Sequence, residues 1–191
     1  MSKHRIVSVR TVFEGWIKVI IAKITAPSGN SFEREIEIHG NAVAVLPYDP
    51  DRRVAIVISQ FRPPIDYLFP GSSHIIEPVA GINDEDDVQD CARREAMEEA
   101  GVRLQVLESV TRCWSMPGIS TEKIECFLAP YSIDDRVASG GGLADENEEI
   151  DVHEWPLRDL AAHMTSGTIV DMKLLVLVQA LQARRPELFS A

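Results

Sequence analysis

The sequence predicts a mixed α/β sandwich with a small antiparallel β-sheet at its N-terminus. Two observations predict this class. Segments with the β-branched or alternating pattern of strands recur along the chain, and helical segments occur both between strands and after the last one. The chain of 191 residues is 45% hydrophobic and 26% charged, which is an ordinary globular composition. A chain of this size can bury a core without a disulfide or a metal ion.

The first forty residues predict β-structure. Residues 16–25 are rich in β-branched side chains, residues 27–30 are typical of a turn, and residues 32–39 alternate between apolar and polar. We therefore expect an N-terminal β subdomain over residues 1–40, followed by one larger domain over residues 41–191. The half-polar sheet of the subdomain suits either a dimer surface or a plain solvent-facing sheet.

The larger domain is expected to begin with an apolar hairpin that belongs to the core sheet. A Pro/Gly-rich loop follows over residues 61–73, and a long acidic loop containing glycines is expected over residues 133–147. The remaining elements are predicted in the following order: strands over 42–47, 54–60 and 75–82, a helix over 87–100, strands over 104–114, 123–131 and 150–155, and helices over 156–164 and 170–183.

Charge and cysteine content exclude several classes of protein. Thirty acidic and nineteen basic residues give a net charge of −11, which argues against a nucleic-acid-binding surface. Cys91, Cys113 and Cys126 lack the spacing of a metal site, which favours thiols in a reducing compartment. No apolar run is long enough for a membrane span or a signal peptide. We therefore expect a cytoplasmic protein that binds neither nucleic acid nor membrane.

The helix predicted over residues 87–100 carries a cluster of acids. Glu95 and Glu99 lie one turn apart on one face, and Glu98 projects beside them. An apolar stripe that recurs every four residues from Val88 to Ala100 borders Glu95 and Glu99, so these two acids are expected at the edge of the buried face.

Carboxylates in such a position repel one another unless they bind a cation or take up a proton. Clustered carboxylate oxygens suit Mg²⁺ or Mn²⁺, and Mg²⁺ commonly joins protein carboxylates to substrate phosphates. A solvated acidic helix with Arg94 paired to Glu98 is the alternative interpretation of the helix taken alone.

Residues 94–102 (REAMEEAGV) resemble the second half of the box of the Nudix hydrolases, G-x5-E-x7-R-E-U-x-E-E-x-G-U, in which U is aliphatic. Gly81 matches the first position of the box, but twelve residues separate it from Arg94 instead of thirteen. An aspartate, either Asp86 or Asp87, replaces the first glutamate of the box. We interpret this difference as a loop shortened by one residue.

Other segments resemble the ADP-ribose pyrophosphatase branch of this family. Residues 77–81 look like its E-x-x-A-G segment, residues 60–62 like its Q-F/Y-R strand end, and residues 142–150 like its acidic catalytic loop. Met116-Pro117-Gly118, the glycines at 140–142 and the shortened box also look like the related GDP-mannose pyrophosphatases. The resemblance implies a Nudix-type α/β/α sandwich with a mixed sheet.

The resemblance also implies the roles of individual residues. The metal ligands would be Glu95, Glu99, Glu148 and the backbone carbonyl of Ala80, and Arg94 would orient the acidic side chains. The catalytic base would be Glu146 on the acidic loop or, as in other Nudix branches, Glu98 on the helix. The residues expected to bind substrate are Arg62, Glu77, Pro117, Gly118 and Glu122.

The implied function is Mg²⁺-dependent hydrolysis of the pyrophosphate bond of a nucleoside diphosphate sugar, with Mn²⁺ as a substitute metal. ADP-ribose, cleaved to AMP and ribose 5-phosphate, is the first prediction. The alternatives are cleavage of GDP-mannose to GMP and mannose 1-phosphate, and a non-catalytic sensor of nucleotide sugars. The resemblance further implies a homodimer in which the N-terminal sheets are exchanged.

Overall fold

The computed structural model describes residues 3–83 and 85–190, and these residues form two compact units. The first unit comprises the described residues up to Ala42 together with Arg112–Ile124, and the second comprises the rest. The boundary that the sequence predicts between residues 40 and 41 remains a prediction.

The first unit contains a three-stranded antiparallel sheet of β1 (Arg5–Glu14), β2 (Lys18–Thr25) and β3 (Ser31–Ile38), in that order. The sequence predicts β2 and β3 as strands, but it does not single out residues 5–14. Every residue of β1 is exposed, so this strand has no buried face to produce a clean alternation of apolar and polar residues.

The second unit is built on a seven-stranded mixed sheet. Its central order is β10-β5-β4-β9-β8, while β6 pairs with β5 and β7 pairs with β4. The distal ends of β8 and β9 are assigned to the first unit. The strands are β4 (Ala42–Asp49), β5 (Val54–Phe61), β6 (His74–Glu77), β7 (Val79–Ile82), β8 (Glu108–Trp114), β9 (Lys123–Pro130) and β10 (Ile150–Pro156).

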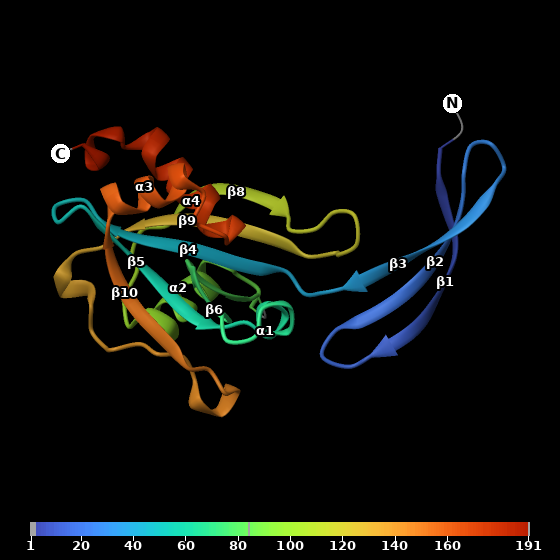
Figure 1. Ribbon diagram of the computed structural model, residues 1–191, viewed down its shortest axis with the longest axis horizontal. Helices are drawn as coiled ribbons and strands as arrows, with labels where there is room; N and C mark the ends of the chain where they lie inside the picture. The colour runs from blue at the N-terminus through green and yellow to red at the C-terminus, as the bar shows by residue number, and fades with distance from the viewer. Residues whose placement is uncertain (1–2, 84, 191) are drawn as a thin grey trace. The chain divides into compact units, whose positions relative to one another are not determined.

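Helices cover both faces of this sheet. Figure 1 shows α2 (Val88–Ala100) on one side of β4 and β5, and α3 (Leu157–Ser166) and α4 (Met172–Arg184) on the other. Residues 43–46 of β4 and 55–58 of β5 are all 0% exposed, and since a strand points successive side chains to opposite faces, both faces of the sheet are covered here. One set, Val43, Val45, Ile56 and Ile58, forms a core with the small residues of α2. The predicted α/β sandwich is therefore confirmed.

Several segments differ from the expected elements, among them residues 75–82, which form the two strands β6 and β7 instead of one. The Pro/Gly segment predicted as a loop contains a short helix, α1 (Pro63–Leu68), which starts with two prolines whose fixed φ suits the first helical turn. The strand predicted from residue 104 begins only at Glu108. Short 3₁₀ helices lie at Ile133–Asp135, Ala144–Glu146 and Pro186–Phe189. Within the described part of the chain, no helix has both the length and the apolar character needed to cross a membrane.

Candidate active site

Helix α2 presents the acidic cluster, and local interactions fix both of its ends. The Asp87 side chain accepts a hydrogen bond of 2.8 Å from the Gln89 N–H, which caps the N-terminus. Gly101 adopts a left-handed conformation with φ of 65° at the other end. The helix predicted over 87–100 is thus observed over 88–100.

Glu95 and Glu99 point toward the backbone of β7. The Ala80 N–H donates a hydrogen bond of 2.9 Å to Oε2 of Glu99. A Cβ atom on Gly81 would overlap the carboxyl group of Glu95, so a side chain here would displace that carboxyl group from its position. These contacts give Gly81 a steric role that its place in the box does not reveal.

The environment of both glutamates opposes their ionisation. The pKa of Glu99 is raised to about 8, mainly by burial and also by the charges of Glu95 and Glu148, although the hydrogen bond from Ala80 opposes this shift. Burial likewise raises the pKa of Glu95 to about 7, although Arg94 opposes this shift. A bound cation would relieve the burial and repulsion of these carboxylates.

Arg94 joins three acids. Its guanidinium contacts Glu85 at 2.8 Å, Glu95 at 3.0 Å and Glu98 at 2.7 Å. The sequence leaves the first acid of the box open between Asp86 and Asp87, whereas the acid that contacts Arg94 here is Glu85. The turn before α2 brings Glu85 to Arg94, and no helical spacing could predict that approach.

The three glycines at 140–142 lie against the C-terminal end of α2. The Gly141 N–H donates to the Glu99 carbonyl at 2.9 Å, and the Gly142 N–H donates to the Glu98 carbonyl at 3.1 Å. A Cβ atom on Gly140 would lie 2.4 Å from the Glu99 carbonyl oxygen. In the structure, Gly141 and Gly142 therefore satisfy carbonyl groups in the last turn of the helix.

Glu148 lies next to Gly142. A Cβ atom on Gly142 would lie 2.7 Å from Cβ of Glu148, and the Leu143 N–H donates to Oε2 of Glu148 at 3.1 Å. The charge of Glu148 acts on both Glu95 and Glu99, as the pKa values show. The backbone of Glu146 ends a 3₁₀ helix, and its side chain lies outside the described part of the structure.

Arg62 and Glu77 form a bidentate ion pair. Nε of Arg62 lies 2.5 Å from Oε1 of Glu77, and Nη2 of Arg62 lies 2.8 Å from Oε2. Glu77 is only 1% exposed, and Oε2 also accepts a hydrogen bond of 3.0 Å from Nζ of Lys173. Burial opposes ionisation of Glu77, but Arg62 and Lys173 together leave its pKa lowered. Sequence reasoning identified Arg62 and Glu77 but missed Lys173.

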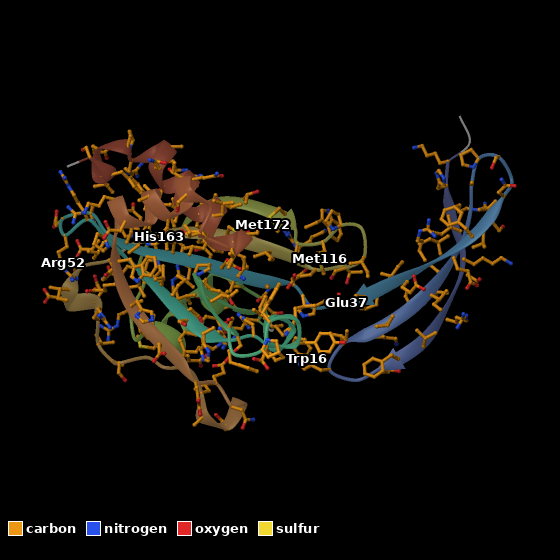
Figure 2. All side chains as sticks on the ribbon, viewed as in Figure 1. Trp16, Glu37, Arg52, Met116, His163 and Met172 are labelled. Atoms are coloured by element: carbon orange, nitrogen blue, oxygen red, sulfur yellow. The ribbon has the colours of Figure 1, made fainter. Side chains whose placement is uncertain are left out.

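The other predicted substrate contacts belong to the first unit. Pro117 and Gly118 lie in a turn closed by the Ser120 N–H, which donates to the Met116 carbonyl at 2.8 Å. Oε1 of Glu122 lies 3.4 Å from Nδ1 of His39. Figure 2 labels Met116, at the start of this turn. The predicted roles of Pro117, Gly118 and Glu122 remain predictions.

The acidic cluster of Glu95, Glu99 and Glu148 suits a divalent cation, because its carboxylates offer oxygen ligands and because burial and neighbouring charges oppose the ionisation of Glu95 and Glu99. Over residues 3–83 and 85–190, no group of three or more Asp, Glu, His or Cys side chains is arranged so that it could hold a metal ion. Glu95 and Glu98 contact Arg94 instead.

Comparisons with known proteins agree with the fold and the helix motif. The family model of the NUDIX domain matches residues 38–172, which is more than half of the chain. A GDP-mannose pyrophosphatase of Cronobacter sakazakii is 37% identical over 152 residues, covering 80% of this chain and 78% of the relative. One of Citrobacter koseri is 34% identical over 151 residues, covering 79% and 78%. The crystal structure of an ADP compounds hydrolase matches with a TM-score of 0.79 and 18% identity, covering 98% and 96% of the two chains, which shows a shared fold.

Proposed function

The chain belongs to the Nudix family, and we propose that it hydrolyses the pyrophosphate bond of a nucleoside diphosphate sugar with Mg²⁺ as cofactor. The observation that carries this proposal is the pair of buried acids, Glu95 and Glu99, whose charges a divalent cation would neutralise. The charged residues of the second half of the box, Arg94, Glu95, Glu98 and Glu99, are all present, which argues against a non-catalytic sensor.

In this proposal, Glu95, Glu99, Glu148 and the Ala80 carbonyl would hold the metal. When bound, Mg²⁺ supplies charge neutralisation for the pyrophosphate and lowers the pKa of a water molecule. Arg94 keeps Glu95 and Glu98 oriented through its ion pairs.

The remaining groups act on the water and the substrate. Glu146 accepts the proton of the attacking water, with Glu98 as the alternative base. Arg62, whose side chain is 36% exposed, binds a substrate oxygen with the N–H groups that Glu77 leaves unused.

Two substrates are supported by different observations. The E-x-x-A-G segment and the acidic loop favour ADP-ribose. The relatives that are 34–37% identical carry the name GDP-mannose pyrophosphatase, and we therefore place GDP-mannose first. The test is hydrolysis of GDP-mannose, ADP-ribose and ADP-glucose at fixed Mg²⁺, with EDTA as control. Strong preference for GDP-mannose is the expected result, and absence of metal-dependent hydrolysis of every sugar nucleotide would refute the proposed function.

We also propose a homodimer formed through the N-terminal sheet. Apolar side chains of this sheet are exposed, including Ile6 at 53%, Val9 at 58% and Phe13 at 55%. A second copy of the chain would cover them, with the sheets exchanged. Sedimentation of the full chain across a dilution series tests this, and a monomer at every concentration would refute it. We further propose that the protein works in a reducing, cytoplasmic setting, which agrees with the three cysteines being thiols in the structure.

A further inference from the structure

A chain of four charged side chains connects the start of helix α4 to Arg62. Asp171 caps α4 by accepting the Leu174 N–H at 2.7 Å, and its other oxygen accepts a hydrogen bond of 2.6 Å from Nζ of Lys173. Lys173 also donates to Glu77, and Glu77 holds Arg62 in turn. The contact between Lys173 and Glu77 joins residues 96 positions apart.

Burial makes this arrangement restrictive. The side chains of Glu77, Asp171 and Lys173 are 2%, 10% and 19% exposed, so water can replace few of their contacts. A buried carboxylate needs partners for both oxygens, and Glu77 obtains them from two cations. The geometry therefore permits few positions of the Glu77 carboxylate.

The position of Glu77 sets the position of Arg62. The Nε and Nη2 atoms of Arg62 both donate hydrogen bonds to Glu77, and these two bonds fix the plane of the guanidinium. Arg62 is close enough to the acidic cluster for its charge to act on Glu99. The N–H groups of Arg62 that Glu77 does not use are therefore available to an anion bound near that cluster.

We propose that Lys173 is a positioning residue that holds Glu77, and through it Arg62, in the orientation that binds the substrate. Lys173 also offsets part of the negative charge of Glu77. The electrostatic potential around Arg62 is therefore more positive, which favours an anionic ligand. This inference rests on the proposed function, because it assigns Lys173 a positioning role at the proposed substrate site.

The first test is a double-mutant cycle on hydrolysis of the best sugar nucleotide. Lys173→Met is expected to raise KM about tenfold with little change in kcat, since it removes binding and not chemistry. In an Arg62→Met background the same substitution is expected to have no further effect on KM. Lys173→Arg retains the cation and is expected to restore most of the affinity. Arg158→Met, which removes an exposed cation from α3, is the matched control.

Two outcomes would overturn the inference: an unchanged KM in Lys173→Met, or a rise in KM that persists undiminished when Arg62 is absent. Lys173→Gln provides the same comparison if the methionine variant does not fold.

A second measurement does not depend on activity. Hydrogen exchange of the Arg62 Nε–H, assigned by its loss in Arg62→Lys, is expected to accelerate about tenfold in Lys173→Met because the Glu77 carboxylate is freed. Equal exchange in the two proteins would contradict the positioning role even if no sugar nucleotide is a substrate. Failure of the proposed function alone would appear as wild-type inactivity with the exchange difference intact.

Discussion

Glu85 and Arg94 form an ion pair of 2.8 Å that connects the turn before α2 to the middle of that helix. The same guanidinium contacts Glu95 and Glu98, so Glu85 is a third anchor for the residue that orients the acidic cluster. The two aspartates that follow Glu85 in the sequence have other environments: Asp87 caps the helix, and Asp86 is exposed.

Removal of this anchor is predicted to lower activity. Glu85→Gln should reduce kcat/KM about tenfold, because a neutral amide holds the guanidinium less firmly than a carboxylate. Asp86→Asn is the matched control and should leave kcat/KM near the wild-type value. Steady-state kinetics of both variants make the comparison, and a larger loss in Asp86→Asn would return the role to the aspartate.

Glu99→Gln is predicted to abolish most turnover without unfolding the protein. The amide oxygen can still accept the Ala80 N–H, and loss of a buried charge removes repulsion from Glu95 and Glu148. We expect kcat to fall at least about a hundredfold and Mn²⁺ binding, measured by electron paramagnetic resonance, to weaken in parallel. Glu149→Gln, an exposed acid, is the control. Wild-type Mn²⁺ affinity in Glu99→Gln would exclude Glu99 as a ligand.

The two candidate bases can be separated by their pH–rate profiles. Glu146→Gln is expected to lower kcat by about 10² to 10⁴ and to remove the acidic limb of the profile, with the Mg²⁺ dependence unchanged. Glu98→Gln should instead act through the loss of its 2.7 Å contact with Arg94 and should retain that limb. If the limb disappears only in Glu98→Gln, the base lies on the helix.

Gly142 is predicted to tolerate no side chain. Gly142→Ala would bring a Cβ atom within 2.7 Å of Glu148, so we expect weaker Mn²⁺ binding and about tenfold lower activity. Gly167→Ala is the matched control, because Gly167 has a similar φ of +74° against +79° but open space around its Cβ position. Both variants should lose melting temperature from backbone strain. Equal Mn²⁺ affinities would show that Gly142 does not position Glu148.

Glu154 is predicted to contribute to the acid sensitivity of the fold. Arg52, which Figure 2 shows in the turn between β4 and β5, and the Tyr131 hydroxyl hold the pKa of Glu154 at about 2. Since this pKa lies below the unfolded value of 4.5, the contribution is complete above pH 4.5 and is lost as pH falls toward 2.

Urea unfolding between pH 7 and pH 3 measures this effect. Glu154→Gln should be less stable at pH 7 and should lose less stability on acidification than the wild type. Asp151→Asn, an exposed acid on the same strand, is the control. Parallel pH dependence of Glu154→Gln and wild type would show that the ion pair contributes nothing to acid sensitivity.

The α/β class and the acidic face of α2 could both be predicted from the sequence. Both follow from local periodicity: a helix places Glu95 and Glu99 on one side, and an apolar run marks a buried strand. It did not reveal β1, whose residues are exposed throughout, or α1, whose prolines are equally typical of a loop.

The contacts that hold the site in place depend on how distant segments pack together. Lys173 reaches Glu77 from a distant helix, Glu85 reaches Arg94 around a turn, and Gly141 and Gly142 donate to the last turn of α2. Each contact joins segments that have no shared periodicity. These contacts form because buried charges and the carbonyl groups at helix ends need partners, and chain packing brings those partners close.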